Sequence, residues 1–288
     1  MSYQKNWNMQ KKLFENIIQN YEILKIVSDK TSKLLKVKCK LNLEVYAIKL
    51  VPINHDFKIP HYDVEVSHTN VINCFKVFDS ILYQKKYYKA YILEWSEFGD
   101  IRSLASSKFK LTNFFFSDII LGLKHLQNLG LFHGDLKPSN ILAFKSDTRI
   151  VFKLADYGVK YKGIGSYITP EYAPPEYLNR EVNSKYDIWC FGCILFELFT
   201  GDLPFGSRTN DNQISEILEN IQNKPLPKEW MKIKEPYRYI IVRCLTKDAQ
   251  NRISNYNDIL DLLKRKPNLF NRIEYLFYYI KGFKNQDI

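Results

Sequence analysis

Apolar and polar positions divide the chain into a strand-rich beginning and a helix-rich remainder. Tyr21–Val27, Leu34–Cys39 and Glu44–Val51 alternate in polarity and are rich in β-branched residues, so each is predicted to form a strand. Phe75–Phe78 and Ala90–Glu94 have the same character, and a polar turn separates them. The pattern therefore predicts a five-stranded sheet in the first part of the chain.

Helical spacing replaces strand alternation further along. Thr112 and Asn113 are typical of a helix N-terminus, and Gly130 is typical of a helix end. The apolar residues between them recur on one face: Phe116, Ile119, Ile120, Leu123 and Leu126. A later apolar stretch contains Cys190 and Cys193, which we expect to be buried free thiols rather than a metal or redox pair.

Composition indicates a globular protein. The chain has 288 residues, of which 45% are hydrophobic and 25% charged. No run of about 18 apolar residues occurs, so no membrane span is expected. Met1–Gln10 lacks the apolar core of a signal peptide, which favours a cytoplasmic or nuclear location.

The formal net charge is +11. Such a charge permits nucleic acid, anionic membrane or acidic-protein partners. The positive residues are scattered along the chain, so a solvated basic surface is favoured over a specific nucleic-acid or membrane partner.

One polar stretch, His133–Asn140, directly follows the long predicted helix, and Asp156-Tyr157-Gly158 comes after it. The order of an aspartate, a lysine and an asparagine, followed by an Asp-aromatic-Gly motif, resembles two motifs of eukaryotic-type protein kinases. These are the catalytic loop H-R-D-x-x-x-x-N and the metal-binding D-F-G.

The resemblance implies a role for each polar residue. Asp135 would accept or orient the attacking hydroxyl, and Lys137 would direct its charge at the transferred phosphoryl group. Asn140 and Asp156 would hold Mg²⁺ or Mn²⁺ through oxygen ligands. The implied cofactors are ATP and this metal ion, and the implied partner is a protein substrate.

The activation segment also resembles the family. Thr169–Glu176 is similar to T-P-E-Y-x-A-P-E, with Pro174 in place of the usual alanine. We expect Thr169 to hydrogen-bond near Asp135 and Lys137, which is the pattern of Ser/Thr rather than Tyr kinases.

Two later motifs carry expected contacts. The resemblance implies that Asp187 braces the backbone of the catalytic loop. It also implies that Arg252 forms a buried ion pair with Glu176, and losing one partner of such a pair costs about 3–5 kcal/mol.

Candidate nucleotide contacts come from the first part of the chain. Lys49 ends Tyr46-Ala47-Ile48-Lys49, which resembles the V-A-I-K strand whose lysine contacts the α- and β-phosphates. The helix glutamate that pairs with this lysine is assigned to Glu65, with Asp56 and Asp63 as rivals.

Leu93–Ser96 resembles the hinge between the lobes, with Leu93 at the gatekeeper position. Backbone groups of Glu94 and Ser96 would then bind adenine. Asp100 lies where the family often has an acid near the ribose, and a helix cap is an equally open interpretation.

The turn between the first two strands departs from the family. Kinases place glycines there because glycine lets backbone N–H groups approach the phosphates closely. This chain has no glycine before Gly99. Lys30 or Lys33 could supply positive charge instead, and weakened ATP binding is expected.

The second departure is Gly134, where regulated kinases carry arginine. That arginine binds a phosphorylated residue of the activation segment. Glycine offers no such partner. We therefore expect activity that does not depend on phosphorylation of Tyr161, Ser166 or Tyr167.

The expected fold is α+β: a bilobal protein-kinase-like fold with a small five-stranded antiparallel N-lobe and a larger, mainly α-helical C-lobe. Expected boundaries are an N-terminal extension at 1–20, the N-lobe at 21–95, the C-lobe at 96–264 and a tail at 265–288. The tail is basic and aromatic, with apolar residues at helical spacing. It would pack on the C-lobe or contact a partner or membrane surface.

Three functions stay open. An ATP-dependent serine/threonine protein kinase is favoured because each charged contact to phosphate or metal has a matching residue. A pseudokinase scaffold with weak or no nucleotide binding is the alternative, since the glycines are missing. A small-molecule kinase of the aminoglycoside or choline type would fit H-G-D-x-x-x-x-N, but Lys137 and Thr169–Glu176 argue against it.

Overall fold

The computed structural model describes residues 19–29, 32–53, 66–83, 85–105, 113–158, 169–179 and 185–264. An antiparallel sheet comes first, with strands β1 (Tyr21–Asp29), β2 (Lys33–Cys39), β3 (Val45–Pro52), β4 (Cys74–Tyr83) and β5 (Lys86–Glu94). Their order across the sheet is β1-β2-β3-β5-β4. All the predicted strands are confirmed, and the last two extend further than predicted because their pairing continues to the turn at Lys85.

The two faces of this sheet have different surroundings. Alternation along β2 sends Leu35 and Val37 into an apolar cluster that also holds Ile48 and Leu50 of β3. Because successive side chains alternate, Lys49 points to the opposite face. That face is directed toward the rest of the molecule.

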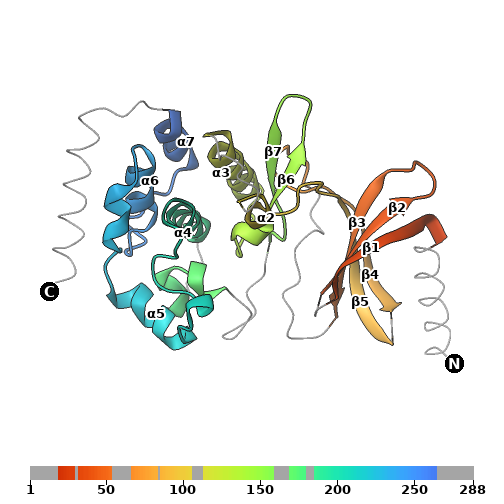
Figure 1. Cartoon of the computed structure of the whole chain (residues 1–288), viewed down its shortest axis with the longest axis horizontal. Coiled ribbons are helices and arrows are strands. Elements are labelled where there is room, and N and C mark those ends of the chain that lie inside the picture. The colour runs from red at the N-terminus through yellow and green to blue at the C-terminus, as the bar shows by residue number, and fades with distance from the viewer. Residues whose placement is uncertain are drawn as a thin grey trace.

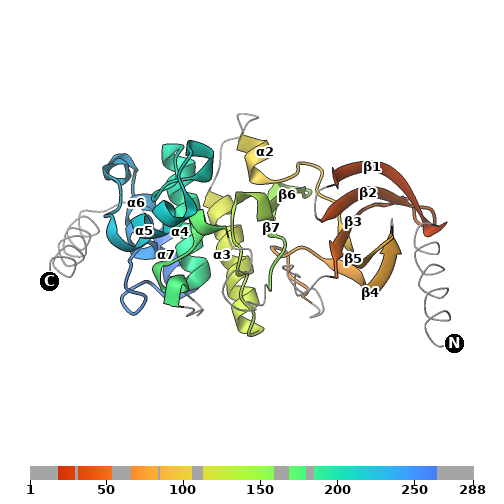
Figure 2. The same ribbon diagram turned by 90° about the horizontal axis from the view of Figure 1, so that it is seen from below.

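Helices and short strands make up the remainder of the described chain. In order they are α2 (Ile101–Ala105), α3 (Asn113–Asn128), η1 (Pro138–Asn140), β6 (Ile141–Lys145), β7 (Ile150–Leu154), η2 (Pro170–Tyr172), η3 (Pro175–Asn179), α4 (Tyr186–Thr200), η4 (Arg208–Asn210), α5 (Ile214–Asn223), η5 (Lys228–Lys232), α6 (Tyr237–Cys244) and α7 (Tyr256–Lys264). Figures 1 and 2 show the sheet at one end, α4–α7 at the other, and α2, α3 and the β6–β7 pair between them. The expected bilobal arrangement is confirmed.

The predicted core helix is α3. Its predicted apolar face is buried, and the helix ends near Gly130, whose φ of 69° is in the left-handed region. A Cβ on Gly122 would lie 2.6 Å from the Asn70 carbonyl oxygen, so the helix approaches the segment before β4 very closely. Glycine at position 122 therefore allows α3 to pack against the backbone that leads into β4.

The second core helix, α4, is buried along most of its length. Cys190 and Cys193 are free and buried, as expected, and burial raises the pKa of both thiols. The helix ends at Gly201, with a φ of 88°. None of the described helices is long and apolar enough to cross a membrane.

Candidate active site

The loop His133–Asn140 connects α3 to β6, and Asp187 in the first turn of α4 holds this loop in place. The Asp187 carboxylate accepts hydrogen bonds from the backbone N–H groups of His133, at 2.7 Å, and Gly134, at 2.9 Å. Burial raises the pKa of Asp187 to about 6, and these bonds oppose the rise. The predicted bracing of this loop is confirmed.

Gly134 has a second, conformational role. Its φ is 77°, in the left-handed region that glycine adopts without strain. Its amide donates to the Asp187 carboxylate in this conformation. Any side chain here would have to tolerate this backbone conformation.

Asp135 is the centre of a cluster of hydrogen bonds. Thr169 donates its hydroxyl to Oδ1 at 3.0 Å, and Lys137 places Nζ 2.9 Å from Oδ2. Lys137 also donates to the Thr169 hydroxyl at 2.9 Å. The expected contacts of Thr169 are therefore present, and they bring residues 32 positions apart around one carboxylate.

Asn140 joins this cluster to the strand that precedes Asp156. Its Nδ2 donates to the Asp135 carbonyl oxygen at 2.8 Å and to Oδ2 at 3.2 Å. Its own carbonyl oxygen accepts from the Ala155 amide at 2.9 Å. Since the amide nitrogen faces Asp135, the side-chain Oδ1 stays available as a ligand.

Lys49 reaches across from the sheet to Asp156. Its Nζ forms an ion pair with Asp156 Oδ2, and the two residues lie 107 positions apart in the chain. Asp156 itself has a φ of 60°, an uncommon conformation for a residue with a side chain. The pair places a cation and a carboxylate side by side where the sheet meets the helical lobe.

The side-chain oxygen atoms at this place are suitable ligands for a magnesium ion. Mg²⁺ prefers oxygen ligands and is usually bound by one or two protein groups together with substrate phosphates. The Asn140 Oδ1 and the Asp156 carboxylate are ligands of this kind, and the structure links them through the Ala155 amide.

Two further candidate contacts to the nucleotide differ in outcome. Glu65, with its rivals Asp56 and Asp63, lies outside the described residues. Lys33 was wrongly predicted as a source of charge over the nucleotide. It pairs with Leu50 in the sheet register and is only 9% exposed, with Nζ 5.9 Å from the centre of the Tyr83 ring. Its side chain is therefore on the sheet face opposite to Lys49.

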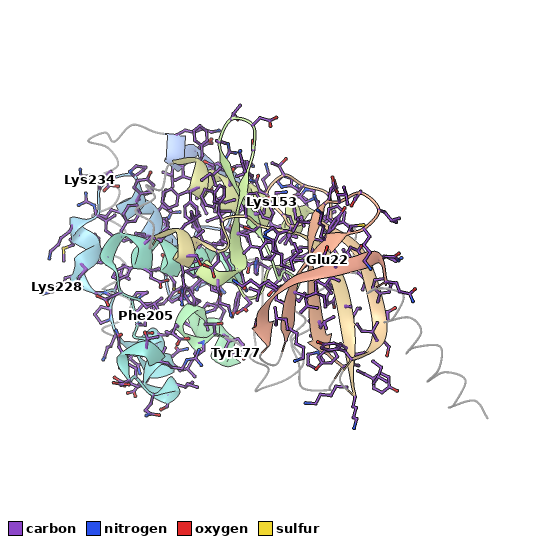
Figure 3. The ribbon with its side chains drawn as sticks, turned by 45° about the vertical axis from the view of Figure 1, so that its right-hand side comes forward. Glu22, Lys153, Tyr177, Phe205, Lys228 and Lys234 are labelled. Atoms are coloured by element: carbon purple, nitrogen blue, oxygen red, sulfur yellow. The ribbon has the colours of Figure 1, made fainter. Side chains whose placement is uncertain are left out.

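The hinge candidate Glu94 uses its side chain to join three segments. One oxygen accepts from the Asn73 amide at 2.7 Å, and the other accepts from Lys153 Nζ, also at 2.7 Å. Lys153 lies on β7, between the sheet and the helical lobe (Figure 3). The Glu94 amide donates to the Asn73 carbonyl oxygen at 3.2 Å. These bonds of Glu94 connect β5, Asn73 and β7 next to the predicted hinge.

Ser96 and Asp100 both make local contacts. The buried Ser96 hydroxyl lies 2.6 Å from the Ala143 carbonyl oxygen and ties the hinge to β6. Asp100 Oδ1 accepts from the amide and hydroxyl of Ser103, both at 2.9 Å. This is the capping interaction that sequence analysis held open as the alternative to a ribose contact.

The predicted ion pair of Glu176 and Arg252 is confirmed. The guanidinium donates to both carboxylate oxygens, at 2.6 and 2.9 Å, and the Arg252 side chain is fully buried. Arg252 also donates to the Lys185 carbonyl oxygen and stacks over the Trp189 ring. The end of the activation segment is therefore anchored to the start of α4.

Sequence analysis missed two clusters beside Thr169. In the first, the Tyr172 hydroxyl contacts Arg102 and Glu197. In the second, Arg208 binds Glu171 through two nitrogens. One available signal was Glu197, an acid near the end of a mainly apolar helix.

Comparison with known proteins agrees with this geometry. Residues 21–265 match the protein kinase domain. The chain is 27% identical over 285 residues to calcium-dependent protein kinase 6 of Plasmodium berghei (strain Anka), covering 90% of this chain and 17% of that protein. It is 29% identical over 239 residues to serine/threonine-protein kinase RUNKEL of Arabidopsis thaliana, covering 78% of this chain and 17% of that protein.

Serine/threonine-protein kinase atg1 of Dictyostelium discoideum is 28% identical over 240 residues, which cover 79% of this chain and 32% of that protein. The chain spans less than a third of the length of each of these relatives. Because the domain match extends over most of its residues, the chain belongs to the protein kinase family.

Proposed function

We propose that the protein is an ATP-dependent serine/threonine kinase that transfers the γ-phosphate of Mg·ATP to a protein hydroxyl. The observation that carries this proposal is the cluster at Asp135, where Lys137, Thr169 and Asn140 all contact one buried carboxylate. Phosphoryl transfer needs positioning and charge neutralisation more than covalent chemistry. This cluster supplies both functions.

Each residue has a role in the proposed reaction. Asp135 would orient the substrate hydroxyl and accept its proton as the phosphoryl group transfers. Lys137 lies beside that carboxylate and would stabilise the negative charge that develops on the phosphoryl oxygens. Thr169 would hold the Asp135 carboxylate and the Lys137 ammonium group in position. It would also shape the space for a serine or threonine side chain of the substrate.

The nucleotide would lie between the sheet and this cluster. Lys49 would contact the α- and β-phosphates, and backbone groups around Glu94 and Ser96 would bind adenine. Asn140 and Asp156 would hold Mg²⁺, which when bound neutralises phosphate charge. The relatives' names, which describe serine/threonine kinases, support the choice of acceptor.

We also propose that activity is independent of activation-segment phosphorylation. The support is Gly134, which has no side chain to bind a phosphate and whose φ of 77° suits glycine. Phosphorylated activation segments act through arginine partners. The end of the segment is anchored by the ion pair of Arg252 and Glu176, which needs no phosphate.

A scaffold function is the second candidate. The glycine-free turn favours it, because side chains in that turn would keep the backbone from approaching the phosphates closely. Lys33, which faces away from Lys49, does not compensate. A scaffold would keep the fold and lose nucleotide binding.

The test combines binding and transfer. Thermal unfolding would be followed with and without Mg·ATP, and autophosphorylation would be measured for wild type and Asp135→Ala. The kinase proposal predicts a raised Tm with Mg·ATP in both proteins, and transfer in the wild type alone. An unchanged Tm with no transfer would support the scaffold. Transfer to a small aminated alcohol but to no protein would indicate a small-molecule kinase of the aminoglycoside or choline type.

A further inference from the structure

The surface beside the Asp135 cluster is formed by the segment that begins at Thr169. Thr169 contacts Asp135 directly, and the buried helix η2 continues from it to Tyr172. A substrate whose hydroxyl reaches Asp135 must therefore place neighbouring residues along this segment. What the segment exposes determines which neighbours are accepted.

Arg102 of α2 extends over one end of the segment. Its Nη2 donates to the Tyr172 hydroxyl at 3.1 Å and to Glu197 Oε1 at 3.4 Å. Tyr172 donates to the other Glu197 oxygen. Both carboxylate oxygens of Glu197 therefore have donors, and its side chain is 21% exposed against 55% for Arg102.

Arg208 of η4 has the same arrangement at Glu171. Its Nε donates to Oε1 at 2.7 Å and its Nη2 donates to Oε2 at 3.1 Å. The Arg208 backbone amide adds a third, longer bond to Oε1. The Glu171 side chain is 7% exposed, whereas that of Arg208 is 50% exposed.

In each pair, the arginine is the more exposed partner and offers hydrogen-bond donors, whereas the glutamate acceptor is the less exposed partner. Within the described residues, the Nε and Nη1 groups of Arg102 and the Nη1 group of Arg208 make no hydrogen bond. Arginine can donate five hydrogens and accepts none. Asp100 acts on Arg102 electrostatically, yet its Oδ1 already accepts from Ser103. The unused hydrogen-bonding groups of Arg102 and Arg208 are therefore all guanidinium donors.

We propose that Arg102 and Arg208 form a recognition site for acidic side chains of the protein substrate, placed beside the hydroxyl that is phosphorylated. This inference rests on the proposed kinase function and specifies its substrate class. A guanidinium binds carboxylate through paired, charge-assisted hydrogen bonds. The net charge of +11 would also attract an acidic partner over longer distances.

The test is direct binding without nucleotide, so that it does not depend on transfer. Fluorescence anisotropy would compare full-length protein with three labelled peptides that carry one serine flanked by Glu, Gln or Arg. We expect tighter binding of the Glu peptide than of the others. Arg102→Gln and Arg208→Gln should each weaken binding of the Glu peptide about tenfold and leave the Gln peptide unchanged.

A matched control separates this site from general attraction to a basic protein. Lys228 is exposed on η5 at the edge of the helical lobe (Figure 3), so Lys228→Gln removes one positive charge elsewhere. It should leave binding of the Glu peptide within twofold. Arg102→Glu gives the converse test, since it should shift preference toward the Arg peptide.

These outcomes decide the inference separately from the kinase activity. Equal loss of Glu-peptide binding in Lys228→Gln and Arg102→Gln would overturn the site, as would wild-type binding that is equal for all three peptides. A folded state that matches wild type by circular dichroism is required of each variant. Selective binding without any Mg·ATP-dependent transfer would contradict only the proposed function.

Discussion

Asp135 and Lys49 lie on opposite sides of the candidate site, and their surroundings differ. Asp135 is 9% exposed and has side-chain contacts from Lys137, Thr169 and Asn140, while Asp187 fixes its loop from beneath. Lys49 projects from a sheet whose neighbouring turn lacks glycine, and among the described residues it forms an ion pair with Asp156. The helical side therefore holds its carboxylate, Asp135, in place through several neighbouring side chains.

The comparison suggests a division of labour. Residues of the helical side would determine the rate of transfer, because they surround Asp135, the carboxylate proposed to accept the proton of the substrate hydroxyl. Residues of the sheet side would determine how tightly the nucleotide is held. Variants on the two sides should then change different kinetic constants, and the following predictions test that division.

The largest effect is expected from the buried pair that anchors the helical side. Arg252→Met leaves the Glu176 carboxylate buried without its partner, so the free energy of unfolding should fall by about 3–5 kcal/mol. Urea denaturation would measure this. Replacing both residues by methionine should cost much less, and equal losses in the single and double variants would argue against a buried-charge penalty.

Asp156→Asn should come next. It removes the carboxylate that pairs with Lys49 and is proposed to hold Mg²⁺. We expect kcat/KM for ATP to fall about a hundredfold, or ~2.7 kcal/mol in the barrier. Asp100→Asn is the control, because Asp100 caps α2 and should affect transfer less than threefold. Comparable losses in the two variants would mean that Asp156 has no special role.

A smaller effect is expected in the glycine-free turn. Ser28→Gly combined with Lys30→Gly should let the backbone approach the phosphates. KM for ATP should fall about threefold, with kcat unchanged. Lys33 is left intact because it is buried in β2. An increase in KM would show that the present side chains contribute to nucleotide binding.

The smallest effect concerns the activation segment. Tyr161→Phe, Ser166→Ala and Tyr167→Phe together should change the rate of transfer less than twofold, because Gly134 provides no partner for a phosphate. Phosphatase-treated wild type should behave in the same way. A tenfold loss in both samples, about 1.4 kcal/mol, would show that another cation binds a phosphate there.

Much of the fold followed from local patterns in the sequence. Strand alternation, the apolar face of α3 and the glycine at its end are properties of neighbouring residues, so their positions were predictable. The ordered motifs also identified Asp187, Glu176 and Arg252, whose contacts the structure shows.

The rest depended on which distant side chains meet. Glu94 joins Lys153 from 59 residues away, and Arg102 joins Tyr172 from 70 residues away. No local pattern encodes such pairs. Lys33 was misjudged for a different reason: its sheet face depends on register, and a shift of one position reverses the direction of the side chain.

The most direct test of this account is steady-state kinetics of Asp135→Asn with Mg·ATP and a protein substrate. Asn keeps the size of the side chain and removes its negative charge. Since general acid–base and positioning groups contribute about a hundredfold to ten-thousandfold, kcat should fall by that range while KM for ATP stays within twofold. An unchanged kcat would contradict the claim that the Asp135 cluster carries the phosphoryl-transfer chemistry.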